Sequence, residues 1–107
     1  MDHDILDRLE LRHSLRPSDR GDEILRFSGY IDCALVVEAV FLLNRSTRFL
    51  QVSEVGVDRN YRRRGICTLV YCKAEELTGL TLLMGDDVSE EAEALWLQKD
   101  RPFGRNL

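Results

Sequence analysis

The chain has 107 residues, of which 44% are hydrophobic and 32% are charged, and its formal net charge at pH 7 is -4. This composition is typical of one globular domain, residues 1–107, and excludes a disordered or low-complexity protein. No segment reaches the ~18 apolar residues of a membrane-spanning helix, and the N-terminus has no apolar run of signal-peptide length. We therefore expect a cytoplasmic protein with no membrane partner.

The cysteines and histidines offer little material for a metal site. Cys33, Cys67 and Cys72 are odd in number and none of their spacings is CxxC, so we expect free thiols. His3 and His13 are the only histidines and lie ten residues apart. We expect neither a metal cofactor nor a histidine-based triad.

The first half of the chain predicts strands. A short element around residues 9–15 precedes a loop at residues 16–23, where Pro, Ser, Asp and Gly gather. Two strands are expected within residues 24–44, with breaks at Gly29 and Asp32. The second of them, residues 34–43, is almost wholly apolar, which predicts a central strand buried on both faces.

The second half predicts a strand, a helix, a strand and a further helix. The strand at residues 48–57 follows a polar turn and is expected to run antiparallel to its neighbour. Helical spacing of apolar residues begins at Gly65 and ends at Leu77, and a short strand follows at residues 80–84. Ser89 is the expected N-cap of the last helix. The apolar side of the first helix is expected to comprise Ile66, Leu69, Val70, Ala74 and Leu77, with Lys73, Glu75 and Glu76 on the other side.

These elements predict an α+β fold whose mixed, mostly antiparallel sheet is flanked by helices. Four arginines, Arg59 and Arg62 to Arg64, lie between the end of a strand and the first turn of a helix. Free amides and the helix dipole favour an anion at such a place, and a glycine such as Gly65 lets phosphate oxygens approach the backbone. The alternative is an arginine-rich loop that is simply solvated.

The segment "VDRNYRRRGICTLV" resembles the acetyl-coenzyme A signature of the GNAT superfamily of N-acetyltransferases. The positions that fit the signature are Val57, Asp58, Tyr61, Arg62, Gly65, Ile66, Thr68 and Leu69. A second stretch is similar to the family's pattern Asn-x-x-Ala-x-x-Leu-Tyr. The four named positions of that pattern correspond to Ser89, Ala92, Leu95 and Trp96, and Phe103 is similar to the family's closing Gly-Phe. The resemblance covers residues 50–103.

The resemblance implies a GNAT-type fold and transfer of an acetyl group from acetyl-coenzyme A to a primary amine. The open site that so short a chain implies suits a lysine or N-terminus of a protein. The strand at residues 48–57 would splay from its neighbour at residues 80–84, and its main chain would bind the pantetheine arm. The implied cofactor-binding residues are Val55, Val57, Arg62, Arg63, Arg64, Gly65, Ile66, Cys67, Thr68 and Trp96.

Three residues depart from the family's pattern. Cys67 replaces a Gly or Ala, Arg63 replaces a frequent Gly, and Trp96 replaces the tyrosine that commonly serves as general acid. Indole N–H can donate a hydrogen bond but does not release a proton at neutral pH. Tyr71, Cys72 or water would then take the acid's role, or the chain is a catalytically degenerate module that binds acyl-coenzyme A or another protein.

Glu54 and Glu38 are the candidate bases for the amine proton. Glu54 lies three residues before Val57, and Glu38 interrupts the apolar run "ALVVEAVFLL", where a carboxylate is costly unless it is paired or functional. Structural alternatives are that Glu54 simply faces solvent and that Glu38 pairs with an arginine. We favour Glu54.

A nucleic-acid-binding role would use the same arginines, but the acidic chain has no other basic stretch and no aromatic platform. The sequence leaves a homodimer open.

Overall fold

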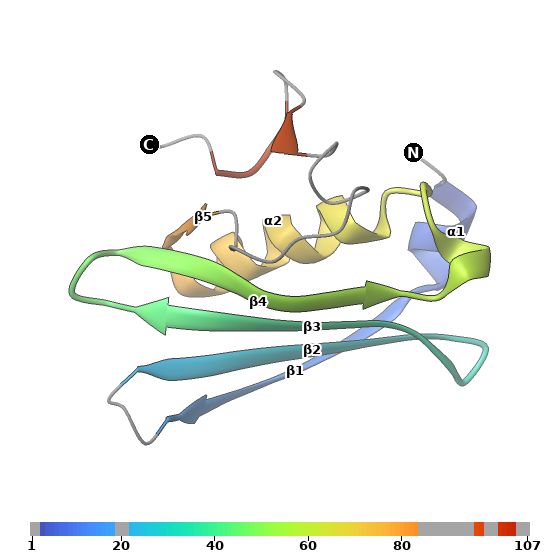
Figure 1. Ribbon diagram of the computed structural model, residues 1–107. Helices are drawn as coiled ribbons and strands as arrows, with labels where there is room; N and C mark the ends of the chain where they lie inside the picture. The colour runs from blue at the N-terminus through green and yellow to red at the C-terminus, as the bar shows by residue number, and fades with distance from the viewer. Residues whose placement is uncertain (1–2, 19–21, 84–95, 98–100, 105–107) are drawn as a thin grey trace.

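The computed structural model describes residues 3–18, 22–83, 96–97 and 101–104 of the chain. Within them the fold is α+β, with a five-stranded mixed sheet in the order β1-β2-β3-β4-β5 (Figure 1). The elements are α1 (His3–Arg8), β1 (Glu10–Pro17), β2 (Glu23–Ile31), β3 (Ala34–Asn44), β4 (Phe49–Val57), the 3-10 turn η1 (Arg59–Tyr61), α2 (Ile66–Thr78) and β5 (Thr81–Leu83).

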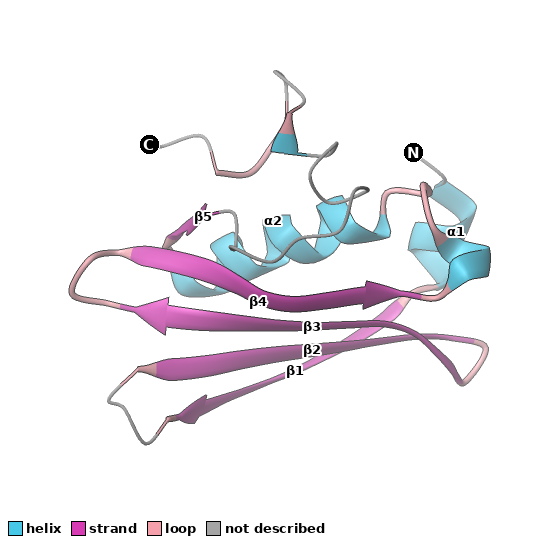
Figure 2. Ribbon diagram, viewed as in Figure 1, coloured by secondary structure: helices cyan, strands magenta, loops and turns pink. Residues whose placement is uncertain are grey.

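The sheet is an antiparallel meander of four strands to which β5 is added in parallel. Each of β1 to β4 pairs with the next along the chain, and the connection from β4 to β5 passes through α2. The expected central position of β3 is confirmed. Helix α2 lies across one face of the sheet (Figure 2), where it closes a core that includes Phe27, Phe41, Leu50 and Val70.

The expectation that β3 is buried on both faces is wrong. Its side chains alternate except at Val36, an extra residue in a bulge against β2, so Leu35 and Leu42, which are 45% and 36% exposed, both lie on the face away from α2. An apolar strand becomes buried on both faces only when helices cover both faces of the sheet. No described element covers this second face, which we call the open face.

The expected strand break at Gly29 is also wrong. Strand β2 continues to Ile31, because the missing Cβ lets β2 approach Val37 of β3: a Cβ at Gly29 would lie 2.4 Å from Val37 Cγ1. The chain reverses instead at Asp32 and Cys33, which have φ angles of 51° and 68°.

Helix α2 lies where the sequence places it, but its buried side is rotated from the expected one. Tyr71 is fully buried whereas Leu77 is 50% exposed. Glu75, expected on the outer side, is half-buried, and its Oε2 accepts hydrogen bonds from Leu82 N at 2.8 Å and Gly104 N at 2.9 Å. The carboxylate therefore joins α2 to β5 and to the segment near the C-terminus.

The predicted last helix, with Ser89 as its N-cap, lies outside the described residues, as does Met84 at the end of the predicted last strand.

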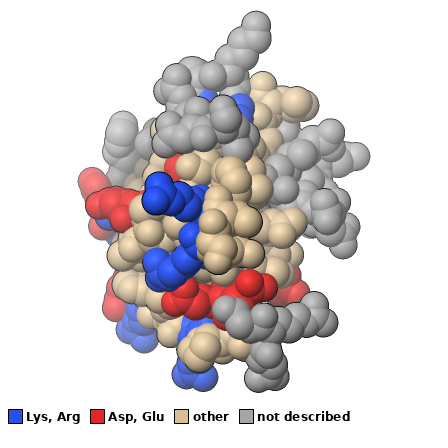
Figure 3. Space-filling model, turned by 90° about the vertical axis from the view of Figure 1, so that its left-hand side faces the viewer, with Lys and Arg blue, Asp and Glu red and all other residues tan. Residues whose placement is uncertain are grey.

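On the side that carries the β3–β4 turn, basic and acidic side chains lie next to one another (Figure 3). One such pair is Arg45 Nε and Glu23 Oε2, 2.5 Å apart. Within the described ranges no helix has the length and apolar character to cross a membrane.

Candidate functional site

The turn between β4 and α2 is held by its own backbone and side chains. Asp58 N donates to Val36 O at 2.7 Å, and the Asp58 carboxylate accepts from Asn60 N at 2.9 Å, which caps η1. Arg62 folds back so that its Nε donates to Val57 O at 3.0 Å. These bonds fix the direction in which the chain leaves the sheet and enters the helix.

Two residues of this turn have left-handed backbone conformations. Gly65 has φ 88°, and Arg63, which stands where the GNAT signature often has a glycine, has φ 61°. Successive residues of alternating handedness turn their amides toward one side, which makes an anion-binding concavity. Arg63 adopts this conformation with a Cβ, at a cost of roughly 1–2 kcal/mol.

The first turn of α2, which follows this turn, leaves its amides free. No side chain caps the helix at Gly65, and the first backbone bond of the helix is Leu69 N to Gly65 O at 3.0 Å. Among the described residues nothing accepts from the amides of residues 66–68, so they remain available, with the positive end of the helix dipole, for an anion. Arg59 and Arg63, in the turn that precedes the helix, are exposed.

Beyond Gln51, β4 has a free edge. The parallel pairing with β5 joins only residues 49–51 of β4 to residues 81–83, so no described strand pairs with Val52 to Val57 on that side, where Val57 O accepts from Arg62 Nε. Val55 and Val57 belong to this stretch and are half-buried. An extended ligand can take up such unpaired main-chain groups in place of a strand.

A bulge in β4 decides which way Glu54 points. Val40 of β3 is opposite Glu54, but the next residue, Phe41, is opposite Val52, so Ser53 is the extra residue. Side chains otherwise alternate, and without the bulge Glu54 would share the core face with Val52. The extra residue places it on the open face instead.

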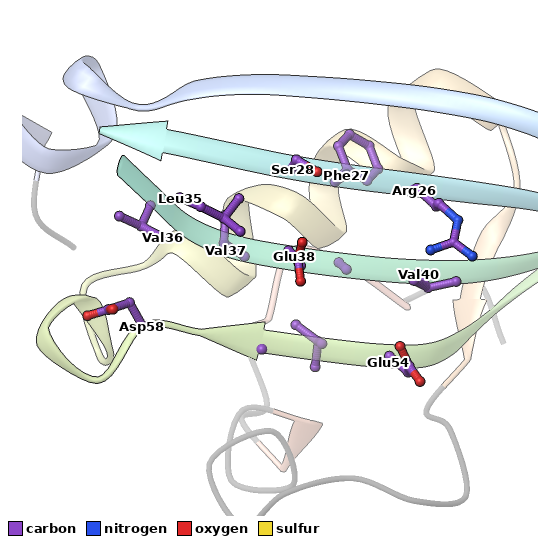
Figure 4. Close-up of a pocket in the computed structure, with 13 residues that line it drawn as sticks. Arg26, Phe27, Ser28, Leu35, Val36, Val37, Glu38, Val40, Glu54 and Asp58 are labelled. Atoms are coloured by element: carbon purple, nitrogen blue, oxygen red, sulfur yellow. The ribbon is translucent and has the colours of Figure 1, made fainter. Parts of the chain in front are cut away.

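Both candidate carboxylates line one hollow of the open face, with a volume of about 480 Å³ (Figure 4). Glu38 is opposite Gly56 and Glu54 is opposite Val40, so the two are diagonal neighbours whose Cα atoms lie about 7–8 Å apart. Both are exposed, and neither forms an ion pair with another described residue. The structural alternative of a Glu38–arginine pair is therefore absent from the described part of the chain.

Arg26 is a residue of this hollow that the sequence reading missed. It is opposite Val40 on the β2 side, so Arg26, Val40 and Glu54 form one row across three strands. Figure 4 shows its guanidinium on the open face, above Val40. The sequence did contain a signal for Arg26: it lies between the apolar residues Leu25 and Phe27, and alternation along a strand places it on the face opposite to theirs.

Trp96 is buried in an aromatic cluster. Its ring centroid lies 6.1 Å from Tyr71 and 5.0 Å from Phe103, and Phe103 lies 4.9 Å from Tyr71. Within the described ranges, the Tyr71 hydroxyl and Trp96 Nε1 are buried without a hydrogen-bond partner. Burial raises the pKa of Tyr71 and the pKa of Cys67, one turn before it on α2. The Tyr71 hydroxyl is therefore a weaker acid than an exposed tyrosine, and in its protonated form it can donate a hydrogen bond.

The expected site residues, apart from Trp96 in the aromatic cluster, thus form three groups. The turn and the first turn of α2 hold Arg62, Arg63, Arg64, Gly65, Ile66, Cys67 and Thr68. The free edge of β4 holds Val55 and Val57, and the open face holds Glu38 and Glu54. Such an arrangement can bind an anion, align an extended ligand along β4 and accept a proton on the open face.

In the described part of the chain no cluster of histidine, cysteine, aspartate and glutamate suits a metal ion. The chain matches no protein-family model, and neither a curated protein nor a solved structure matches it.

Proposed function

We propose that the chain is a GNAT-type N-acetyltransferase that moves an acetyl group from acetyl-coenzyme A to a primary amine on a protein, a lysine or an N-terminus. The observation that carries the proposal is the continuity between the free edge of β4 and an anion-binding turn. Residues 52–57 lack a described neighbouring strand on one side and lead to the left-handed Arg63 and Gly65 and the free amides of α2. A cofactor with an amide-bearing arm and a pyrophosphate needs these two features side by side.

In this proposal the pantetheine arm lies along Val55 and Val57 and bonds their main chain, where it replaces Arg62 Nε as the donor to Val57 O. The pyrophosphate lies against the amides at the start of α2, where Gly65 leaves room for its oxygens. Arg62, Arg63 and Arg64 balance the negative charge, and an arginine that bonds two phosphate oxygens adds directional hydrogen bonds as well.

The acceptor amine enters from the open face, since Glu54 lies on β4 itself and its carboxylate points there. Glu54 takes a proton from the amine, directly or through a water molecule, because only the neutral amine is a nucleophile. The amine nitrogen then attacks the thioester carbonyl, the C–N bond forms and the C–S bond breaks. The leaving thiolate takes up a proton and departs as the free thiol of coenzyme A. Glu38 is the second candidate for the base.

The proposed chemistry differs most from that of the family in the group that donates to the leaving thiolate, because Trp96 replaces the usual tyrosine. Trp96 can donate only a hydrogen bond, and it packs within the aromatic cluster. The buried hydroxyl of Tyr71 is a candidate donor, with Cys72 or water as alternatives. The burial of Trp96 also favours the second candidate function, a catalytically degenerate module that binds acyl-coenzyme A without turnover.

Calorimetric titration with acetyl-coenzyme A, followed by a thiol-release assay with an amine-bearing peptide, tests the proposal. Gly65→Glu should abolish binding, because a bulky anion then occupies the phosphate position. Gly79→Glu is the matched control: Gly79 is also left-handed, with φ 70°, but ends α2 at its far side. It carries the same charge and the same backbone cost, and binding should persist.

Binding with amine-dependent thiol release supports the enzyme, whereas binding without release supports the degenerate module. If Gly65→Glu binds acetyl-coenzyme A as well as the parent does, the phosphate site is misplaced. No binding by the parent chain, with binding of an oligonucleotide in a parallel titration, would replace the proposal with a nucleic-acid-binding function.

A further inference from the structure

Strand β1 leaves one edge of the sheet without a partner in the described part of the chain (Figure 1). Six of its eight residues are exposed. Leu15 is 45% exposed, although it is opposite the buried Leu25 and shares the core face with it. An edge strand of this length with an exposed leucine is a template for pairing with another strand.

The residues of β1 are complementary to their own reversed order. We propose that β1 pairs antiparallel with β1 of a second copy of the chain, with His13 facing its own copy on a two-fold axis. In this register Glu10 faces Arg16 of the second copy, Leu11 faces Leu15, and Arg12 faces Ser14. The symmetry repeats each of these contacts, so the dimer has two of each.

The symmetry restricts the register to a few alternatives. A two-fold axis perpendicular to the sheet keeps α2 of both copies on the same side, so directly opposite residues must point to the same face. The neighbouring registers allowed by this rule are shifted by two residues. One places Arg12 opposite its own copy, and the other places Arg12 opposite Arg16. Like charges directly opposite each other are destabilising, so both are disfavoured.

The proposed register also covers an apolar side chain and provides hydrogen-bond partners for main-chain groups, both of which the single chain leaves exposed. Leu15 becomes covered by Leu11 of the second copy, and the outer main chain of residues 10–16 gains ladder hydrogen bonds. Pro17, which has no N–H to donate, lies just outside the paired residues and costs no bond. The contact is one strand pair long, so we expect a weak dimer rather than an obligate one.

Sedimentation equilibrium of the whole chain, from about 1 to about 500 μM, tests this dimer. Glu10→Arg places arginines opposite each other twice, and Arg16→Glu places glutamates opposite each other twice. Each should raise the dissociation constant at least about tenfold, because each changes two cross-strand pairs. The double variant restores opposite charges and should restore the dimer.

Glu76→Arg is the matched control for Glu10→Arg. Both glutamates are exposed, and each lies near a basic side chain of its own element: Glu10 is 3.1 Å from Arg12, and Glu76 is 3.5 Å from Lys73. Glu76, however, is on α2 and lies outside the proposed interface. The control should leave the dissociation constant unchanged, and circular dichroism should show that all variants are folded. A parent chain that stays monomeric throughout, or a dimer that tolerates both single reversals, overturns the proposal.

Discussion

Removal of the Glu75 carboxylate should destabilise the fold far more than its place in the sequence suggests. Its Oε2 accepts from Leu82 N at 2.8 Å and from Gly104 N at 2.9 Å. Glu75→Ala leaves both amides without an acceptor in half-buried surroundings. At roughly 1–3 kcal/mol for each fully buried group, reduced here for partial exposure, the expected loss is about 2–4 kcal/mol in the free energy of unfolding.

That loss is a large fraction of the roughly 5–15 kcal/mol that stabilises a typical domain. The melting temperature should fall by about 10–25 °C. Glu75→Gln keeps an oxygen acceptor but loses the charge, so we expect an intermediate loss of about 1–2 kcal/mol. Glu76→Ala, at the exposed neighbouring position, should change stability by less than about 0.5 kcal/mol.

Urea unfolding followed by far-ultraviolet circular dichroism measures these differences. Tryptophan fluorescence adds a local readout, because Trp96 is the only tryptophan and packs beside the segment that Glu75 holds. The two signals should shift together if the carboxylate supports the whole fold. Equal stability of Glu75→Ala and Glu76→Ala would refute the reasoning.

The remaining predictions concern the proposed site. Glu54→Gln should keep acetyl-coenzyme A binding and lower turnover by roughly 10²–10⁴-fold, with partial recovery at higher pH because more amine is then neutral; inactivity of a folded Glu38→Gln alone would move the base to Glu38. Arg63→Gly should raise the free energy of unfolding by up to about 1 kcal/mol, since glycine accepts the left-handed backbone, and should weaken acetyl-coenzyme A binding; a loss of stability in urea would contradict this. Alkylation with iodoacetamide should reach the exposed Cys33 first, while the raised pKa of Cys67 leaves little thiolate near neutral pH, so its labelling should increase only as the pH rises. Mass spectrometry of the labelled peptides checks the order, and fast labelling of Cys67 at neutral pH would contradict it.

The sequence by itself determined the order and type of most elements. Apolar runs and turn residues placed β3, β4, α2 and β5 to within one or two residues, because local hydrophobic periodicity and capping glycines are written directly in the chain. The strand, turn and helix around Gly65, and the arginines there, were also available from the sequence. These features depend on neighbours along the chain, which a sequence shows.

Only the tertiary structure decided which faces are covered and where each candidate carboxylate points. The apolar run of β3 predicted burial on both faces, but burial depends on whether another element lies above each face. The direction of Glu54 depends on the one extra residue at Ser53, and a bulge leaves no periodic signal in so short a strand. Glu75 looked like an outer helix residue because its two partners, Leu82 N and Gly104 N, are backbone groups from distant segments. Contacts of this kind arise from the way the chain closes on itself, so no local pattern contains them.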